Sequence, residues 1–376
     1  MSNKNIESNL KKILRGKKGC NPQDHLYTLM NKTKTFMKGS KGKQLGEGSY
    51  GKVYRGSIND EGKRYVAYKE IKTPKLSNNV TLADLRKSLK SNPAKMEYTI
   101  AKKLQGFGVP ETYLYKECPD KQIVYTEVID GTDLRKWLKT KPSLDAMKSV
   151  IVQTIYNLYR IHKKHPKFRH HDLHGENVLV RKVPKKDIKI RLNNKSYTIS
   201  NGGVEPVMID FGFALFPRVK NPLINENNYK SIGISRKSHK LYDVHFFLKD
   251  IFHQIKQPSN MEERRVYQFI RKLFPDEYMK NNSPTYLKNA RLRGNRNAAH
   301  TLYLPGFEKV LGSSFFTGET QLSRAIPKLT PKTVTRVVLA PVQPKTPVNK
   351  AKAYARAVAA MKTGVVLPKK RPGIAR

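Results

Sequence analysis

Apolar and polar residues alternate along this chain with two different periods, which predict strands first and helices later. Residues 53–58 and 64–71 alternate as half-buried strands do, and residues 59–62 between them are typical of a tight turn. From Pro93 the period lengthens, because Ile100, Ala101 and Leu104 recur at the spacing of one helical face. The chain therefore begins with a hairpin and then changes to helix.

Longer periodic segments follow in the second part of the chain. Residues 143–165 predict a helix whose apolar face holds Leu144, Met147, Ile151, Ile155 and Leu158. Residues 187–203 alternate around an N-N-K turn and predict a hairpin, and residues 242–252 predict an apolar helix that anchors a core. We therefore expect an α+β fold with a small β-rich lobe over residues 44–128 and a larger helical lobe over 129–318.

Composition adds two basic flanking segments to this picture. The chain has 38% hydrophobic residues, enough for a core, but 74 Lys and Arg against 29 Asp and Glu give a net charge of +45. Residues 1–43 form a basic N-terminal extension. Residues 319–376 hold eight Lys and five Arg against Glu319, with Pro throughout, and predict a disordered tail. Such charge predicts binding to nucleic acid or another polyanion.

Cysteine and hydropathy patterns suggest a compartment. Cys20 and Cys118 are too few for a disulfide framework, which favours a reducing environment. The first residues lack an apolar signal region, and no apolar run reaches membrane-spanning length. We expect a soluble, intracellular protein with no membrane partner, and the P-K-K-R cluster at 368–371 is compatible with nuclear entry.

The first candidate for chemistry is a glycine-rich loop. Gly46, Gly48 and Gly51 spell G-x-G-x-x-G, whose backbone can approach phosphates closely. The same glycines also open dinucleotide-binding units, but those continue into a helix, whereas strands follow here. The pattern favours a lid over a nucleotide, formed by Leu45, Gly46, Glu47, Gly48, Ser49, Tyr50, Gly51 and Val53.

A lysine on the next strand fits the same nucleotide. Lys69 ends V-A-Y-K, where it can pair with the α- and β-phosphates while Ala67 lies beneath the purine. A lysine in this position needs a carboxylate partner on the following helix. Glu97 shares the apolar face of that helix and is preferred, and Asp84 is the competing candidate.

Two later motifs supply the groups for phosphoryl transfer. Residues 169–180 read R-H-H-D-L-H-G-E-N-V-L-V, which places Asp172 to accept a hydroxyl proton and Asn177 to ligate Mg²⁺. Residues 207–214 read V-M-I-D-F-G-F-A, whose Asp210 can hold the same metal. His174 stands where it can contact the γ-phosphate, which would make the rate pH-sensitive.

His170, His171 and His174 also spell H-H-x-x-H, which raises zinc as an alternative. A fourth ligand is missing from the pattern, so phosphoryl transfer is preferred. His171 replaces the arginine that usually precedes the catalytic Asp, and we therefore expect activity without phosphorylation of the activation segment. Glu176 favours basic substrate residues, unless it is an ordinary solvated acid.

These motifs resemble those of the eukaryotic-type protein kinase superfamily over residues 44–318. G-E-G-S-Y-G-K-V, V-A-Y-K, H-H-D-L-H-G-E-N and I-D-F-G occur in the order of its subdomains. The H-H-D-L-H-G-E-N-V-L-V run, the missing A-P-E triplet and Y-D-V-H-F-F-L look like the divergent serine/threonine kinases of large DNA viruses. The resemblance implies a bilobal fold, ATP and Mg²⁺ as cofactors, and packaging in a virion.

The resemblance also assigns a hinge between the lobes, where backbone groups bind the adenine edge. Residues 123–138 fit this segment, with Thr126 at the gatekeeper position, Glu127 and Ile129 giving backbone contacts, and Asp133 reaching the ribose. We therefore expect an ATP-dependent serine/threonine protein kinase with protein substrates and a polyanion-binding tail. The alternatives are a nucleic-acid-binding virion protein on a weakly active kinase scaffold, and a small-molecule phosphotransferase.

Overall fold

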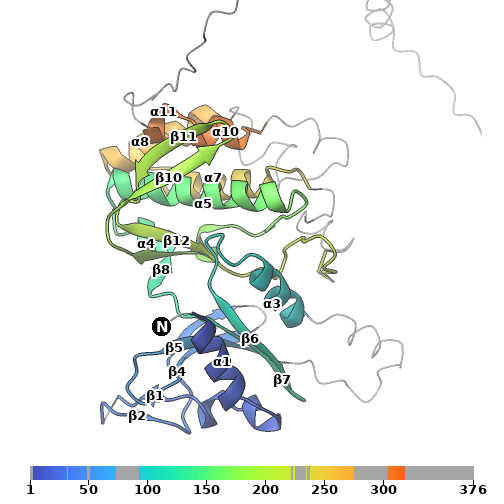
Figure 1. Ribbon diagram of the computed structural model, residues 1–376. Helices are drawn as coiled ribbons and strands as arrows, with labels where there is room; N and C mark the ends of the chain where they lie inside the picture. The colour runs from blue at the N-terminus through green and yellow to red at the C-terminus, as the bar shows by residue number, and fades with distance from the viewer. Residues whose placement is uncertain are drawn as a thin grey trace, which may run out of the picture. The chain divides into compact units, whose positions relative to one another are not determined.

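The fold joins a β-rich N-terminal part to a helical C-terminal part (Figure 1). The computed structural model describes residues 3–31, 33–48, 51–72, 93–221, 223–224, 234, 238–274 and 304–317. The predicted mixed α+β class, with its strands first and its helices after, is confirmed. The basic tail and Asp84 lie outside the described residues.

The N-terminal part is built on a five-stranded antiparallel sheet in the order β3-β4-β5-β7-β6. Its strands are β3 (Gln44–Gly48), β4 (Gly51–Ser57), β5 (Tyr65–Lys72), β6 (Thr112–Glu117) and β7 (Lys121–Glu127). Tyr68 and Tyr125 lie fully buried within it, because aromatic residues fill a pleated surface well. The β4–β5 hairpin confirms the predicted strand, turn and strand, and the dinucleotide-binding alternative is wrong because no helix follows the glycines.

The N-terminal segment is packed into this part of the molecule. It consists of α1 (Asn3–Ile13), η1 (Lys17–Cys20), η2 (Pro22–Asp24), β1 (Thr28–Leu29) and β2 (Phe36–Met37). Leu10, Leu14 and Leu26 are at most 2% exposed and belong to the same hydrophobic core as Tyr68 and Tyr125. Glu7 accepts hydrogen bonds from Lys11 and Lys102, which joins α1 to helix α3 (Pro93–Lys103).

A disulfide between Cys20 and Cys118 corrects the expectation drawn from the cysteine count. The two residues are 98 positions apart, and only the packing of η1 beside the turn after β6 brings their Cα atoms to 5.7 Å, within bonding reach. Lys116 also donates to the carbonyl oxygens of Leu14 and Gly16 at 2.6 and 2.5 Å. The inference of a reducing compartment therefore loses its basis.

The C-terminal part packs helices around a long central helix. Ser143 caps α5 (Leu144–Lys164) by accepting from the amide of Ala146, and eleven residues of that helix are buried. The predicted helix over 143–165 is thus confirmed. The other helices are α4 (Leu134–Leu138), α7 (Tyr242–Gln254), α8 (Met261–Leu273), α10 (Phe307–Leu311) and α11 (Ser314–Thr317).

Two small sheets complete this part. Strands β12 (Val204–Met208), β9 (Val178–Lys182) and β8 (Gly131–Asp133) form one sheet, and the short helix η3 (Gly175–Asn177) directly precedes β9 in the chain. Strands β10 (Asp187–Leu192) and β11 (Lys195–Ser200) form the predicted hairpin, with Asn193 at a positive φ of 51° in its turn. Ile190 and Leu192 bury its inner face, so the hairpin is an integral part of the core.

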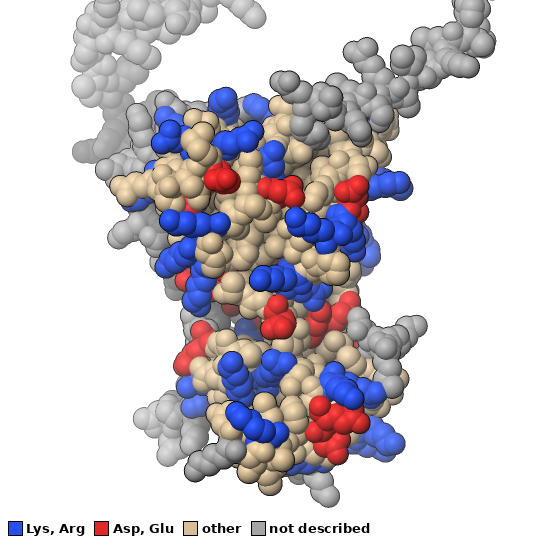
Figure 2. Space-filling view, turned by 90° about the vertical axis from the view of Figure 1, so that its left-hand side faces the viewer, with Lys and Arg blue, Asp and Glu red and all other residues tan. Residues whose placement is uncertain are grey.

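Charged side chains are spread over the face of the molecule seen in Figure 2. Figure 2 shows Lys and Arg side chains over the whole of one face, with Asp and Glu side chains between them. Among the residues that the structure describes, no helix is both long and apolar enough to cross a membrane.

Three buried histidines predict an acid-sensitive fold. Burial lowers the pKa of His162 and His171 to about 4 and that of His245 to about 3. The unfolded chain therefore binds more protons than the folded chain between about pH 6.5 and 4, and the free energy of unfolding falls as pH falls through this window. We expect the urea midpoint to drop between pH 7 and pH 5, and to drop less steeply in His245→Gln. Parallel pH curves for the two proteins would contradict this account.

Candidate functional site

Strand register brings the first group of predicted residues onto one face of the sheet. Val53 lies opposite Lys69 across β4 and β5, and Ala67 lies opposite Thr126 across β5 and β7. Opposed residues of antiparallel strands project to the same side, and so do residues two apart on one strand. Val53, Ala67, Lys69 and Thr126 therefore share the face on which helix α3 supplies Glu97.

Lys69 forms an ion pair with Glu97. Its Nζ lies 2.9 Å from both carboxylate oxygens, and the two side chains are 17% and 16% exposed. Burial raises the pKa of Glu97, opposed by the charge of Lys69 and reinforced by the negative charge of Asp210. This coupling shows that Asp210, more than a hundred residues later in the chain, lies within electrostatic reach of the pair.

The two ends of the glycine-rich loop have different surroundings. A Cβ at Gly51 would lie 2.2 Å from the carbonyl oxygen of Glu70, so strand packing alone requires glycine there. A Cβ at Gly46 would meet nothing within 4 Å, so the space beside its backbone is open. Leu45 is 43% exposed at this edge. The predicted residues Ser49 and Tyr50 lie outside the described residues.

The predicted hinge residues run from the end of β7, which holds Thr126 and Glu127, to Asp133 at the end of β8. The Glu127 side chain accepts from Arg181 at 2.6 Å, and its amide donates to the carbonyl of Glu111 at 2.7 Å. The Ile129 carbonyl accepts from the amide of Gly131 at 3.0 Å. Asp133 caps α4 through the amide of Lys136 at 2.9 Å, so its contact with a ribose stays a prediction.

The loop that carries Asp172 is held from beneath by helix α7. Asp243, 1% exposed, accepts the backbone amides of His170 at 2.7 Å and His171 at 2.9 Å. His171 has a φ of 65°, which is strained for a residue with a side chain. The two charge-assisted hydrogen bonds hold the backbone in this conformation.

A second carboxylate of α7, missed by the sequence analysis, holds the far end of the loop. Asp250 accepts the amide of Gly175 at 2.8 Å and pairs with Arg135 of α4 at 2.7 Å. Arg135 also lies 3.1 Å from Glu176. Asp243 and Asp250 are about two helical turns apart on one face. A second acid at that spacing on an apolar helix was the signal that could have revealed this contact.

Between these anchors lies a compact polar cluster. The Asn177 amide nitrogen donates to the Asp172 carbonyl at 2.8 Å and lies 3.4 Å from its carboxylate. His174 Nε2 lies 3.7 Å from the Asp172 carboxylate, and Nδ1 lies 3.6 Å from Glu176. The predicted residues Asp172, His174 and Asn177 are thus neighbours.

Asp210 is tethered to the same loop through the residue before it. The Ile209 amide donates to the Asn177 carbonyl at 2.9 Å, and the Ile209 carbonyl is 3.0 Å from His170 Nε2. Asp210 has a positive φ of 64°, and its side chain accepts from the amide of Gly212 at 3.1 Å. A single backbone hydrogen bond, between Ile209 and Asn177, therefore holds the segment that carries Asp210 against the loop that carries Asn177.

The zinc alternative finds no support in this geometry. His170 is directed to Ile209, whereas His171 contacts the Phe213 carbonyl at 3.0 Å and the Ser238 hydroxyl at 2.5 Å. Within the described part of the chain, no three His, Cys, Asp or Glu side chains are grouped to hold a metal ion.

The residues present fit a magnesium–nucleotide complex. Because the Asn177 amide nitrogen is engaged by Asp172, its amide oxygen is the atom left for a metal, and the Asp210 carboxylate is the second predicted oxygen donor. Oxygen donors of this kind suit Mg²⁺, which is usually held by one or two side chains together with the substrate phosphates. The ammonium of Lys69 and the open backbone at Gly46 suit those phosphates.

Comparisons with known proteins agree with this geometry. The family model for the protein kinase domain matches residues 40–218, and the model for poxvirus serine/threonine protein kinases matches residues 138–300. A protein of Acanthamoeba polyphaga mimivirus that bears the name of a serine/threonine-protein kinase is 28% identical over 183 residues, 45% of this chain and 39% of its own length. A probable serine/threonine-protein kinase of Invertebrate iridescent virus 6 is 26% identical over 245 residues, 54% of this chain and 42% of its own.

The chain is therefore similar to protein kinases over residues 40–300, and the relatives that it resembles come from large DNA viruses. A probable kinase of Invertebrate iridescent virus 3 is also similar, with 29% identity over 127 residues, 33% of this chain and 24% of its own. The chain spans less than half the length of each of these relatives.

The two α7 carboxylates give separable predictions. Asp243→Asn replaces one of the two accepting carboxylate oxygens with an NH2 group, which donates. The buried amide of His170 or His171 then loses its acceptor, which should lower the free energy of unfolding by about 1–3 kcal/mol. Amide exchange in a peptide covering 168–173 should accelerate about 10- to 100-fold.

Asp250→Asn is the matched control and should accelerate exchange around Gly175 instead. Hydrogen exchange followed by mass spectrometry measures both segments. Equal acceleration of both segments by either variant would mean that the carboxylates act only through global stability.

Proposed function

We propose that this chain is an ATP-dependent serine/threonine protein kinase that transfers the γ-phosphate to protein hydroxyls. The observation that carries the proposal is the Lys69–Glu97 ion pair, with both contacts at 2.9 Å, within electrostatic reach of Asp210. Phosphoryl transfer needs positioning and charge neutralisation rather than covalent chemistry, and this arrangement is suited to both.

The side chains divide the work as follows. Asp172 accepts the proton of the substrate hydroxyl, and its position is supported by the hydrogen bond from Asn177 to its carbonyl at 2.8 Å. Asn177 and Asp210 hold Mg²⁺, which when bound neutralises the charge on the β- and γ-phosphates. Lys69, fixed by Glu97, orients the α- and β-phosphates. His174, whose Nε2 lies 3.7 Å from the Asp172 carboxylate, contacts the γ-phosphate.

The nucleotide base binds on the same sheet. The loop from Leu45 to Val53 covers the phosphates. Ala67 lies under the purine and Thr126 is the gatekeeper, an assignment supported by their pairing across β5 and β7. The backbone of Glu127 and Ile129 pairs with the adenine edge, and Asp133 lies towards the ribose.

Activity in this proposal needs no phosphate on the activation segment. His171 replaces the usual arginine, and its ring contacts the Phe213 carbonyl and Ser238. Asn221 adds hydrogen bonds to the carbonyls of Gly212 and Ala214, both at 2.9 Å. Neutral contacts thus support the segment where other kinases use a phosphate–arginine pair.

The proposal is tested by phosphate transfer from radiolabelled ATP to a basic protein, an acidic protein or an aminoglycoside mixture. Asp172→Asn should lower the rate of protein labelling at least 100-fold, because it removes the proton acceptor. Asp187→Asn, the same chemical change at an exposed site on β10, should leave the rate unchanged.

Labelling of the aminoglycosides alone would identify a small-molecule phosphotransferase. No labelling at all, with DNA binding retained, would favour a nucleic-acid-binding virion protein on an inactive scaffold. A phosphatase-treated sample should keep its activity, and loss of nearly all of it would refute the account of His171.

The basic tail is proposed to bind nucleic acid or another polyanion, in a virion of the kind that the viral relatives come from. Residues 319–376 carry eight Lys and five Arg against one Glu. Such a density of cations supports counterion release as the driving force for binding.

Deleting residues 319–376 should weaken DNA binding and flatten its salt dependence, by about 0.9 in the log–log slope for each DNA phosphate that the tail neutralises. A variant with the thirteen tail Lys and Arg changed to Gln keeps the length and should behave like the deletion. Fluorescence anisotropy at several salt concentrations measures the slope. An unchanged slope in both variants would remove the tail from DNA binding.

A further inference from the structure

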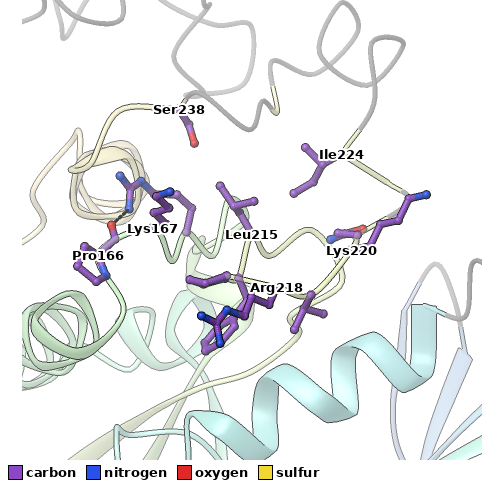
Figure 3. Close-up of a pocket in the computed structure, with 12 residues that line it drawn as sticks. Pro166, Lys167, Leu215, Arg218, Lys220, Ile224 and Ser238 are labelled. Atoms are coloured by element: carbon purple, nitrogen blue, oxygen red, sulfur yellow. Dashed lines mark hydrogen bonds between the residues drawn. The ribbon is translucent and has the colours of Figure 1, made fainter.

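A cavity of about 650 Å³ lies between the segment after Asp210 and the catalytic loop, which is the loop that carries Asp172 (Figure 3). Its floor is apolar: Leu215, Phe216, Val219 and Ile224 line it together with two prolines. Phe216 and Ile224 are 4% and 6% exposed. In Figure 3 the Leu215 and Ile224 side chains face one another across the open space. The cavity can therefore hold an apolar side chain.

Cations surround this apolar floor. Lys167, Arg169, Arg218 and Lys220 line the cavity, and none of its lining residues is acidic. Among the residues that the structure describes, none of these four side chains is within ion-pair distance of a carboxylate. The cavity therefore carries positive charge that no facing group of the described protein neutralises.

One of these cations is built into the wall. Arg169 is 6% exposed, and its guanidinium donates to the carbonyls of Pro166, Phe168 and His239. Burial lowers the pKa of Arg169, opposed by the more distant charge of Asp243. The three carbonyls satisfy the hydrogen bonds of the guanidinium but do not neutralise its charge. Binding of an anion in the cavity is therefore favoured.

The cavity is connected to the catalytic loop. Arg169 lies three residues before Asp172, and Ser238, at the rim, contacts His171 Nε2 at 2.5 Å. Arg218 is held at a φ of 63°, a backbone conformation unusual for arginine. Glu176, the acid expected to attract basic substrates, is itself paired with Arg135 at 3.1 Å. The cavity beside this loop therefore presents positive charge to a substrate.

We propose that this cavity selects acidic peptide substrates. An apolar side chain of the peptide packs on Leu215 and Ile224, while an adjacent carboxylate or phosphorylated side chain pairs with Arg218 and Lys220. The inference rests on the proposed kinase function, because it names the substrate class of the same site. It reverses the preference for basic substrates that Glu176 alone suggested.

Three fluorescent peptides test the proposal, each with one serine and one leucine, flanked by glutamates, by phosphoserines or by lysines. Anisotropy without ATP measures binding to the full chain, and phosphate transfer is followed separately. We expect the glutamate and phosphoserine peptides to bind at least 10-fold more tightly than the lysine peptide. Tighter binding of phosphoserine than of glutamate identifies a phosphorylated site as the source, and equal binding identifies a carboxylate.

The double variant Arg218→Glu/Lys220→Glu should weaken binding of both acidic peptides at least 10-fold and improve binding of the lysine peptide. Lys189→Glu/Lys195→Glu on the exposed edge of β10 and β11 makes the same change in net charge and should alter binding less than twofold. Arg218→Asn/Lys220→Gln keeps a residue that tolerates positive φ and should weaken acidic binding in the same direction, which guards against misfolding.

The outcomes separate this inference from the proposed function. Charge-selective binding that the double variant abolishes, without phosphate transfer to any peptide, would support the cavity and refute the kinase activity. Transfer to all three peptides with equal KM, or equal effects of the double variant and its control, would refute the cavity and leave the activity intact.

Discussion

The site depends on two buried carboxylates of one helix. Asp243 and Asp250 lie about two turns apart on α7 and hold the backbone of residues 170–171 and 175 on either side of Asp172. Isolated carboxylates in a core are costly, but each here accepts at least two donors, and Asp250 also has the charge of Arg135. The loop therefore takes its conformation, including the strained φ of His171, from the helix beneath it.

A second constraint joins the glycine-rich sheet to this loop. The sheet contributes Lys69, which is paired with Glu97 of α3, and the loop contributes Asn177, whose carbonyl is bonded to the residue before Asp210. The raised pKa of Glu97 reflects both its burial and the charge of Asp210. A divalent cation bound between these groups would offset the negative charge of Asp210. A polyphosphate bound there would offset the positive charge of Lys69.

The N-terminal segment stabilises the same arrangement from outside. Its leucines complete the core behind the sheet, and Glu7 reaches Lys102 at the end of α3 at 2.8 Å. The disulfide from Cys20 to Cys118 fastens η1 beside β6. Residues read from composition as a basic extension are therefore structural partners of the helix that carries Glu97.

Short-range sequence patterns by themselves determined much of the secondary structure and the order of the motifs. The hairpin before Lys69, the capped helix from residue 144, the β10–β11 hairpin and the order of the motifs were all readable, because each depends on period, caps or turn residues within a short stretch. Of the residues named from those motifs, the fold pairs Lys69 with Glu97 and brings Asp172 beside His174 and Asn177, and Ser49 and Tyr50 lie outside the described residues. Only the tertiary structure decided the Cys20–Cys118 bond, the pairing of Asp250 with Arg135 and Gly175, and the cationic cavity beside Arg218. These contacts join residues far apart in the sequence, and no local periodicity encodes which buried charges or thiols will meet once the helices and the sheet have packed.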